Sequence, residues 1–369
     1  MADIVEKGEG AIALSPTNID SNCLTYEKDN TYISTYKYEE SPEIKIFAGD
    51  IIFVKTGSTV GKVAFVDNII DRTTLNPQLV VLKQVKCNPY FLYLLMAAPC
   101  FQKHIKRITV GGAVPTLSQN EMGRIGITLP PNAEQDRISA LFKLLNYRIE
   151  TQRKIIEDLK KLKDAINNSL HNNINEFQLF SFNELGNDYS GLAGKSSDDF
   201  GSGLPYISYL NVFRNDIVTD GPFDYVKVSK TEKQNIVSYG DLLFTLSSET
   251  PSEVGIGAIY LGKTNPLYLN SFCFGVHLSN QENIYGPYLA YFITSQYFRR
   301  TILPFAQGST RYNLMKSDFM KHKFCFPNMA SQKAIYNALH TLSEKIQNEE
   351  VSLNKYTEQK QYLLTRLFI

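Results

Sequence analysis

The sequence is short of the features that mark membrane-spanning, secreted and metal-binding proteins. No apolar run approaches the ~18 residues that a membrane helix needs, and the first ten residues lack the apolar core of a signal peptide. None of the five cysteines stands in a C-x-x-C pair, and no four Cys and His residues cluster as structural zinc requires. We therefore expect a cytoplasmic protein with free thiols, no metal site and no membrane contact.

An excess of charge of one sign is also missing. The 369 residues contain 38 Lys and Arg against 37 Asp and Glu, a formal net charge of +1. This balance excludes a uniformly basic nucleic-acid binder, but not one whose basic residues lie on one face. Hydrophobic residues make up 43% and charged residues 20%, so the chain can bury a core, and its length favours two domains.

Catalytic motifs are absent as well. The stretch Thr56–Val63 is one residue too short for a phosphate-binding loop, and Val63 stands where Ser or Thr would bind magnesium. Asn76-Pro77-Gln78-Leu79 is not the Asn-Pro-Pro-aromatic motif of amino-methyltransferases. The histidines have no partner at nucleophile or metal spacing: His104, His171, His277, His322 and His340. The sequence thus predicts a non-catalytic chain.

What the sequence does contain is an internal repeat. Gly49–Phe53 recurs as Gly240–Phe244 at an offset of 191, and Asn88–Tyr93 recurs as Gly286–Tyr291 at 198. Three further matches lie at 197: Thr116-Leu117 with Asn313-Leu314, Leu129-Pro130 with Phe326-Pro327, and Gln135 with Gln332. The small drift in offset is what loop insertions between two copies of one unit produce.

Each copy reads as a globular part followed by a long helix. Short Val-, Ile-, Phe- and Tyr-rich runs broken by Gly, Asn, Asp and Pro predict strands and turns, with single helices expected over 89–107 and 287–303. The predicted fold class is α+β, with two mixed α/β domains in tandem repeat and a two-helix coiled coil between them. The expected boundaries are 1–131 and 176–328 for the domains, and 132–175 and 329–369 for the helices.

The heptad pattern of the two long helices is the strongest physical signal. The predicted seam residues are Ile138, Phe142, Leu145, Ile149, Ile156, Leu159, Ile166 and Leu170 in the first helix, and Ile335, Leu339, Leu342, Ile346, Leu353, Leu363 and Leu367 in the second. Polar residues interrupt both seams at equivalent places, where they either set the register or mark solvated ends. The alternative is that each helix packs only on its own domain.

Charge is sorted along each copy although the total is neutral. Residues 1–50 carry a net charge of −6 and residues 51–132 carry +6, whereas residues 177–253 carry −6 and 254–329 carry +5. A basic surface on each domain is the expected footprint of a phosphate backbone. The alternative is that the acidic and basic segments interleave in space and cancel.

The order of these motifs resembles the specificity subunits of type I restriction-modification systems. The block Gly49–Lys62, its echo Gly240–Phe244, and the Leu/Phe-Pro…Gln starts of the two long helices carry the resemblance. It implies two target-recognition domains, an antiparallel helix pair, and a subunit that binds double-stranded DNA without catalysis. The implied partners are two modification subunits, which use S-adenosylmethionine to methylate adenine, and restriction subunits, which use ATP and Mg²⁺. This chain would bind none of these cofactors.

Antiparallel pairing of two repeat helices predicts a bipartite DNA reader. The pairing would place the two domains at opposite ends, where each could read one half of a split target. A seam of about 48 Å, at ~1.5 Å per residue, exceeds one DNA turn of ~34 Å. We therefore expect the helices to set the length of an unread spacer.

Phosphate contacts are expected from basic side chains and from Gly, Ser and Thr loops, and base contacts from Arg, Asn or Gln. The candidates are Lys55, Ser58, Thr59, Lys62, Arg72, Gly111 and Gly112 in the first domain, and Ser247, Ser248, Gln307, Ser309, Thr310, Arg311, Asn313 and Lys316 in the second. Arg311, Gln307 and Asn313 are the predicted base readers. For each candidate, a role in turn formation or surface solvation is the alternative.

One departure separates the two copies. The second copy has Phe182–Phe200 before Gly201–Ser208, whereas only seven residues precede the matching Gly8–Ser15. This difference predicts that the first domain lacks an opening strand, and it suggests a truncated or late start.

A different class of function is also open from sequence. A coiled-coil scaffold or inhibitor would bind proteins through its globular parts rather than DNA. Salt-sensitive DNA binding in the presence of modification subunits would separate the two interpretations. A self-contained nuclease or methyltransferase is disfavoured by the missing motifs.

Overall fold

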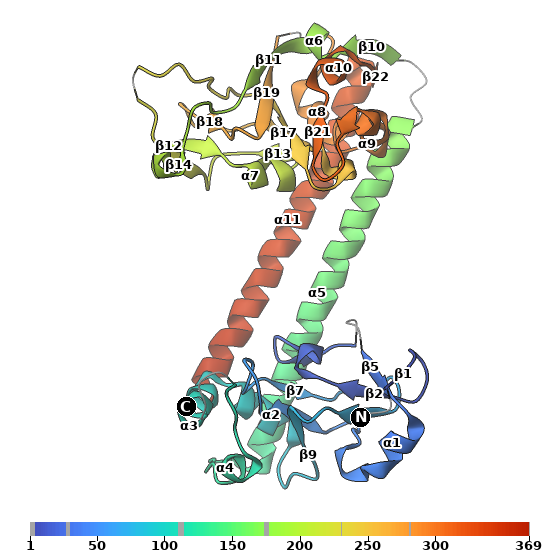
Figure 1. Cartoon of the computed structure of the whole chain (residues 1–369), viewed down its shortest axis with the longest axis vertical. Helices are drawn as coiled ribbons and strands as arrows, with labels where there is room; N and C mark the ends of the chain where they lie inside the picture. Colours follow the sequence, from blue (N-terminus) through green and yellow to red (C-terminus); the bar gives the residue numbers. More distant parts are fainter. Residues whose placement is uncertain are drawn as a thin grey trace. The chain divides into compact units, whose positions relative to one another are not determined.

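The computed structural model describes residues 4–26, 30–109, 114–172, 177–229, 231–279 and 282–368. The chain divides into two compact units. Unit 1 comprises Met1–Arg153 and Val351–Ile369, and unit 2 comprises Lys154–Glu350. Each unit therefore contains one globular part together with a portion of both long helices (Figure 1).

The described residues of unit 1 form two sheets. The first has the order β1 (Ile4–Val5), β5 (Thr31–Ile33), β2 (Ala11–Leu14), β8 (Thr73–Leu75); the second has the order β3 (Ile19–Asp20), β4 (Cys23–Leu24), β7 (Val63–Phe65), β6 (Ile51–Val54), β9 (Leu79–Leu82). All four residues of β6 are buried, because β6 lies between antiparallel β7 and β9. Strand β9 has no second neighbour among the described residues.

Unit 2 repeats this plan with additional strands. Its sheets are β11 (Gly186–Ser190), β19 (Cys273–Leu278), β15 (Leu242–Thr245), β17 (Gly257–Tyr260), β13 (Ile217–Val218); β14 (Asp224–Val226), β12 (Phe200–Ile207), β18 (Tyr268–Leu269); β16 (Ser247–Ser248), β21 (Tyr312–Leu314), β20 (Ala306–Gln307); and β10 (Phe177–Ser181) with β22 (Lys323–Pro327). Strand β15 is the buried counterpart of β6. The predicted opening strand is thus present in unit 2 as β11, and the hypothesis of a late start stays a prediction.

Short helices complete both units. Unit 1 has α1 (Thr35–Glu40), α2 (Pro89–Ala97), α3 (Pro99–Ile108) and α4 (Gln119–Gly123); unit 2 has α6 (Phe182–Leu185), α7 (Tyr209–Arg214), α8 (Leu289–Phe292), α9 (Gln296–Ile302) and α10 (Lys316–Lys321). Single 3₁₀ turns lie at Pro16–Asn18, Pro42–Ile44, Ser197–Asp199, Pro251–Glu253, Gly286–Tyr288 and Leu303–Phe305.

The predicted single helices over 89–107 and 287–303 are wrong, because each is broken. Pro99 disfavours the helical conformation for Ala98, which is extended with ψ 145°, so α2 ends and α3 begins with Pro99. In unit 2, the hydroxyl of Ser295 accepts a hydrogen bond from Phe298 N and starts α9 as an N-cap.

Both long helices begin with the same buried glutamine contact. The side-chain oxygen of Gln135 accepts a hydrogen bond from Asn88 N at 2.9 Å, and that of Gln332 accepts one from Tyr285 N at 2.8 Å. Each amide also donates to the preceding proline carbonyl, Pro130 or Pro327. These contacts explain the Pro…Gln motif. They also pair Asn88 with Tyr285 at an offset of 197, which corrects the sequence match of this segment at 198.

The helices α5 (Asn132–Asn172) and α11 (Met329–Arg366) run antiparallel within each unit. In unit 1, Phe142 near the start of α5 lies against Phe368 beyond the end of α11, and the Arg148 guanidinium donates to the Tyr356 hydroxyl at 2.8 Å. In unit 2, Lys160 pairs with Glu350 at 2.7 Å, and Ile166 packs on the core that contains Ile335 and Leu339. Residues later in α5 therefore contact residues earlier in α11, as antiparallel helices require.

Most predicted seam residues are removed from solvent. Phe142, Ile149, Ile156, Ile335, Leu339 and Ile346 are buried, whereas Ile138, Leu145, Leu159, Ile166, Leu342, Leu353 and Leu363 are half-buried. The polar seam residue Gln152 is also buried, and Lys163 pairs with Asp216 at 2.6 Å, so neither lies at a solvated end. Phe142 and Leu339 belong to the globular cores, so both proposed roles of the helices, seam and domain packing, are present.

Leu170 and Leu367 are the two seam predictions that the structure contradicts. They are 37% and 43% exposed, while the next residues, His171 and Phe368, are 3% and 4% exposed. A strict 3.5-residue repeat drifts by ~20° per heptad against a straight helix. At these ends the helices pack on residues of the globular parts: the His171 ring stacks on Tyr288 at 5.5 Å, and Phe368 contacts Phe91 at 5.3 Å.

His171 and Phe368 occupy equivalent positions at an offset of 197. The buried imidazole of His171 predicts that this contact in unit 2 is sensitive to acid. Burial lowers the pKa of His171 below its usual value near 6.5, because the charged imidazole would lose water. The stability that depends on neutral His171 is therefore full above about pH 6.5 and falls as the pH drops below it. We expect His171→Phe to make unit 2 less sensitive to a change from pH 7.5 to 5.5 in urea denaturation. An unchanged pH dependence would contradict this role of His171.

Candidate nucleic-acid interface

Equivalent residues of the two copies form the same backbone contact near the candidate loops. In unit 1, Thr56 pairs with Thr116 as an antiparallel bridge; in unit 2, β16 pairs with β21 and sets Ser247 opposite Asn313. The offsets are 191 and 197, as in the sequence repeat. Each unit therefore places the residues that follow β6 or β15 beside the segment that leads to α4 or α10.

In unit 2 this arrangement brings most of the predicted DNA-binding residues together. Strand β21 pairs with β20 on its other side, with Gln307 opposite Asn313. The turn between them begins at Gly308, whose φ is +147° and where a Cβ would lie 2.1 Å from the Arg311 carbonyl oxygen. The side chains at the exposed end of this hairpin are polar: Gln307, Ser309, Thr310, Arg311 and Asn313.

Arg311 is held in place on this hairpin. Its Nε donates to the Ser247 hydroxyl at 3.3 Å, and its guanidinium lies 5.2 Å from the ring centroid of Phe272. Phe272 is itself 51% exposed, so the stacked pair borders solvent. A guanidinium fixed on an aromatic ring keeps further N–H donors for a carboxylate, phosphate or guanine edge.

Three other candidates in unit 2 have contacts inside the protein. Ser247 and Ser248 are 5% and 9% exposed, and the Ser248 hydroxyl donates to Glu253 at 2.8 Å. Lys316 forms an ion pair with Asp188, and its ammonium lies 5.0 Å from the Phe274 ring. These contacts give Ser248 and Lys316 structural roles, whereas Ser247 acts on Arg311.

In unit 1 the candidates divide between two places. Ser58, Thr59 and Lys62 line one cavity of about 410 Å³ together with Gln78. The Lys62 ammonium donates to the Ile19 carbonyl at 3.3 Å. Lys55 lines a different cavity, and exposed Arg72 lies beside Asp71 at the start of β8. Gly111 and Gly112 lie outside the described residues.

Two residues of these surfaces were missed by sequence reasoning. Phe272 stands in a turn, and nothing in its local sequence indicates that a guanidinium stacks on it. Gln78 lies in the segment Asn76–Leu79, whose residue types gave no sign of this role; its backbone carbonyl accepts a hydrogen bond from Lys55 N at 2.9 Å. The carbonyl thereby fixes the start of the loop that carries Ser58 and Thr59.

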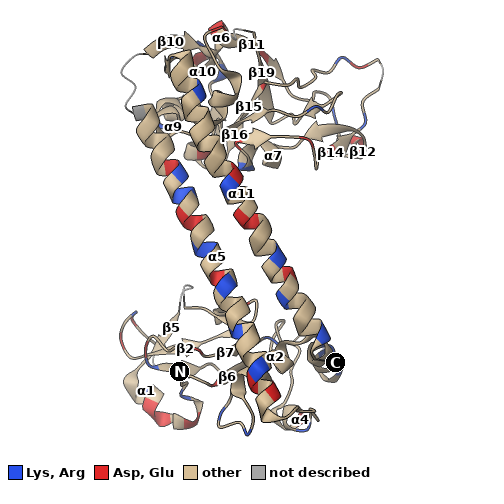
Figure 2. Cartoon of the chain, turned by 180° about the vertical axis from the view of Figure 1, so that it is seen from behind, with Lys and Arg blue, Asp and Glu red and all other residues tan. Residues whose placement is uncertain are grey.

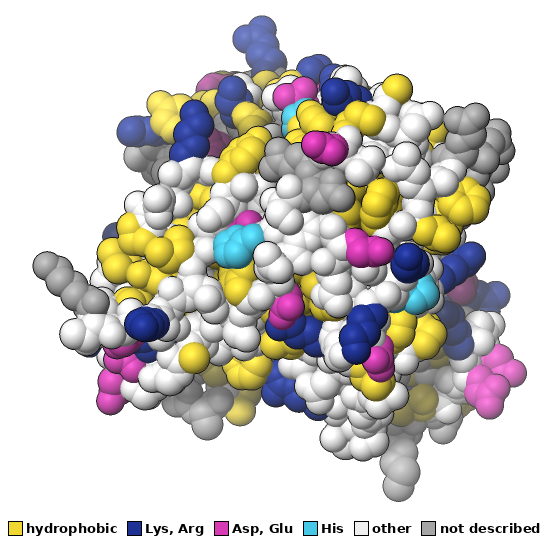
Figure 3. All heavy atoms as spheres, turned by 90° about the horizontal axis from the view of Figure 1, so that it is seen from above, with side chains coloured by type: hydrophobic (Ala, Val, Ile, Leu, Met, Phe, Trp, Pro, Cys, Tyr) yellow, Lys and Arg dark blue, Asp and Glu magenta, His cyan; other side chains and the backbone are white. Residues whose placement is uncertain are grey.

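The charges of the described residues do not gather into one patch on the face shown in Figure 3, where Lys and Arg are scattered among hydrophobic and uncharged side chains. Along α5 and α11, residues of both signs follow one another (Figure 2). The prediction of one basic surface per domain therefore finds no support on this face.

His277 contacts a carboxylate that is distant in the sequence. Its Nδ1 lies 2.8 Å from Asp241 Oδ1, and the Tyr189 hydroxyl donates to Asp241 Oδ2 at 2.7 Å. Burial and the adjacent carboxylate raise the pKa of Tyr189. No Ser or Cys nucleophile takes part in these contacts, which join β11, β19 and the residue before β15.

Neither a metal centre nor a membrane helix is found in the part of the chain that the structure describes. No group of three or more His, Cys, Asp or Glu side chains could hold an ion. No helix there is both long and apolar enough to span a bilayer.

Comparison with known proteins identifies the family. The profile of the type I restriction modification DNA specificity domain matches the chain twice, over residues 7–176 and 175–358. The chain belongs to this family. Each specificity domain thus includes one globular part and most of the long helix that follows it, and the resemblance noted in the sequence is confirmed.

Relatives of this family match nearly the whole chain. The putative type I restriction enzyme MjaX specificity subunit of Methanocaldococcus jannaschii is 23% identical over 96% of this chain and 84% of its own length. The MjaVIII specificity subunit of the same organism is 22% identical over 88% of this chain and 79% of its own length.

Two solved structures share the specificity-subunit fold. A chain from a study of complex assembly and conformational transition in the type I R-M system has a TM-score of 0.59 at 17% identity, covering 96% of this chain and 90% of that one. The S subunit from M. genitalium has a TM-score of 0.55 at 17% identity, covering 100% and 94%. At this identity the two structures bear on the fold alone, and they agree with the predicted α+β class and tandem domains.

Proposed function

We propose that this chain is the DNA specificity subunit of a type I restriction-modification complex, with residues 1–131 and 176–328 each reading one half of a bipartite target. The observation that carries the proposal is the repeated loop-and-strand contact of the two specificity domains, Thr56 with Thr116 and Ser247 with Asn313. A duplicated reading surface suits a target in two parts. The chain itself catalyses nothing in this proposal.

The hairpin of β20 and β21 reads bases in the second half of the target. Gln307, Arg311 and Asn313 are exposed there, and Arg and Asn or Gln are the side chains that recognise guanine and adenine edges. Ser309 and Thr310 in the turn of the hairpin supply hydroxyl donors for phosphates. In the first half, Ser58, Thr59, Lys62 and exposed Arg72 contact the phosphate backbone.

The antiparallel helices set the distance between the two half-sites and provide the docking surface for two modification subunits. Exposed residues along α5 and α11, such as Leu144 and Tyr147, give those subunits apolar contacts. S-adenosylmethionine belongs to the modification subunits, and ATP and Mg²⁺ belong to the restriction subunits. Calorimetry of the isolated chain should therefore show no S-adenosylmethionine binding.

Arg311→Ala is expected to weaken recognition of one half-site only. The loss of a positioned guanidinium should reduce binding free energy by about 1–3 kcal/mol, and gel shifts with each half-site altered in turn would measure it. Arg214→Ala, which removes another exposed arginine of unit 2, is the matched control. An equal loss at both half-sites would show that the two domains do not read separately.

The scaffold alternative makes the opposite prediction for DNA. In the presence of modification subunits, a specificity subunit binds DNA with an affinity that falls steeply as salt rises. A protein-binding scaffold shows no such salt-dependent shift. This gel-shift series tests the proposed function without knowledge of the target.

A further inference from the structure

Unit 2 contains one continuous segment, Phe177–Ser190, that closes its core. Strand β10 pairs with β22, α6 turns inward, and β11 pairs with β19. The two inward residues of α6, Phe182 and Leu185, are both 0% exposed. The segment thus combines two strand pairings with a Phe-x-x-Leu anchor.

The anchor Phe182 lies among four aromatic rings. The ring centroids of Phe244, Phe298, Phe319 and Phe324 are 5.5, 6.1, 5.1 and 5.2 Å from that of Phe182. Removal of this one side chain would leave an apolar hollow lined by β15, α9, α10 and β22.

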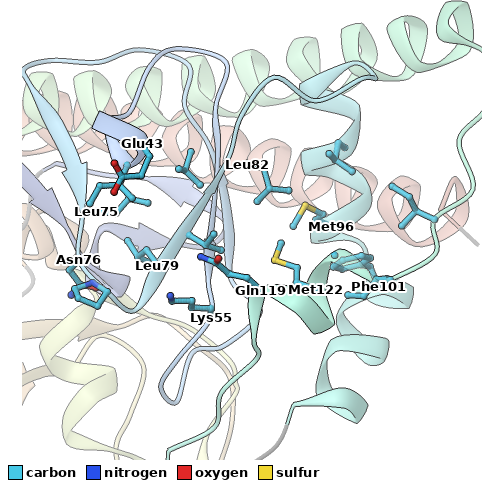
Figure 4. Close-up of a pocket in the computed structure, with 18 residues that line it drawn as sticks. Glu43, Lys55, Leu75, Asn76, Leu79, Leu82, Met96, Phe101, Gln119 and Met122 are labelled. Atoms are coloured by element: carbon cyan, nitrogen blue, oxygen red, sulfur yellow. The ribbon is translucent and has the colours of Figure 1, made fainter. Parts of the chain in front are cut away.

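Unit 1 has such a hollow at the equivalent place. The counterparts of Phe298, Phe319 and Phe324, at an offset of 197, are Phe101, Met122 and Ile127. All three line a cavity of about 570 Å³, together with Val80 and Leu82 of β9. Figure 4 shows Leu82, Met96, Met122 and Phe101 grouped at one end of this cavity. We call this cavity the β9 groove.

In unit 1, the counterparts of the two strands that pair with this segment have no such partner among the described residues. Strand β9, the counterpart of β19, forms the edge of its sheet among the described residues. Residues 125–130, the counterpart of β22, form no strand. Their side chains Ile127 and Leu129 are 41% and 40% exposed, whereas Phe324 and Phe326 in unit 2 are fully buried. An edge strand beside an apolar groove is the arrangement used for strand addition by a peptide.

We propose that the β9 groove is a docking site for a peptide segment of a partner polypeptide, with the chemistry of Phe177–Ser190: a Phe-x-x-Leu turn followed by a strand. The internal repeat argues for this occupant, because the same surface in unit 2 already holds such a segment. The copy at residues 177–190 is committed to unit 2, where Phe182 and Leu185 are buried. The proposal concerns a protein contact and does not depend on DNA recognition.

One position distinguishes the expected occupant from Phe177–Ser190. A Cβ at Gly275 would lie 2.1 Å from the Tyr189 ring, so glycine is needed beneath that tyrosine. The register of β9 puts Val81 at the place of Gly275, since Ile52 opposes Val81 as Leu243 opposes Gly275. A segment bound to the β9 groove should therefore carry a small residue in place of Tyr189.

The test uses the full chain and a fluorescent peptide of residues 177–190 with Tyr189→Ala. Anisotropy should show saturable binding that weakens at least tenfold when the peptide also carries Phe182→Ala. It should be unchanged by Phe177→Ala, because Phe177 is 55% exposed in unit 2. Hydrogen exchange should show new protection at residues 79–82.

Five results would overturn the proposal. Absence of saturable binding, or equal binding of the Phe182→Ala peptide, would exclude the Phe anchor. Protection confined to unit 2 would mean that the peptide only exchanges with the chain's own segment. Tighter binding of the parent peptide with Tyr189 would contradict the argument from Val81. A dimeric chain that the peptide splits into monomers would make a second copy the occupant instead of a partner.

Discussion

Insertion of four residues after Arg153 and four after Glu350 should abolish modification of the original DNA target and create a target with a longer spacer. These sites are equivalent at an offset of 197, and the inserted turns add about 6 Å to each helix at ~1.5 Å per residue. At ~3.4 Å per base pair, the spacer should grow by about two base pairs. Methylation mapping of the variant with its modification subunits measures the change.

Insertion into α5 alone is the matched control for this result. It would shift the contacts of Arg148 with Tyr356 and of Lys160 with Glu350 out of register, so DNA recognition should be lost without a new target. Four residues form a stutter that a helix pair accommodates by local unwinding. An unchanged spacer after the double insertion would show that the helices do not measure the distance between half-sites.

Phe182→Ala should lower the free energy of unfolding of unit 2 by about 3–5 kcal/mol. The side chain is fully buried among Phe244, Phe319 and Phe324, and α6 cannot move inward to fill the space without breaking the strand pairs on either side of it. Because domains of this size are stable by only ~5–15 kcal/mol, recognition of the second half-site should fail as well.

Phe177→Ala is the control within the same segment. Its side chain is exposed, so stability should change by less than about 0.5 kcal/mol. Hydrogen exchange separates the two units: for Phe182→Ala, protection should fall in β15 and β19 and stay unchanged in β6 and β7. A uniform loss across both units would show that they do not unfold separately.

The sequence was sufficient for the features that depend on periodicity and repetition. The heptads predicted both long helices, and the paired Gln135 and Gln332 marked their starts, because a buried amide that joins two backbone groups leaves a repeated motif. The segments that the offsets of 191 and 197 align are paired in the same way in both units, Thr56 with Thr116 and Ser247 with Asn313.

Features that depend on contacts between distant segments were not predictable in this way. The burial of Phe182 has no counterpart in the first copy, so the repeat gave no signal for it. The contacts of His277 gave no signal in the sequence because Asp241 and Tyr189 come from distant segments of the chain. At the end of α5, His171 is buried in place of the predicted Leu170 because it packs on Tyr288. A heptad pattern carries no information about this contact.

The DNA-binding candidates that were chosen by residue type lie together in the structure only in part. Arg311, Gln307 and Asn313 share one hairpin, whereas Lys55 and Lys62 line different cavities. Residue type identifies donors that could reach DNA, but only tertiary structure shows which donors already serve the protein, as Ser248 serves Glu253.

Methylome sequencing of cells that express this chain with its modification subunits tests the two-domain reading most directly. We predict adenine methylation at a target of two short sequences separated by a spacer of fixed length. We also predict that Arg311→Ala relaxes only one of the two sequences. Methylation of a single uninterrupted sequence, or relaxation of both halves by Arg311→Ala, would contradict the proposal that each domain reads its own half-site.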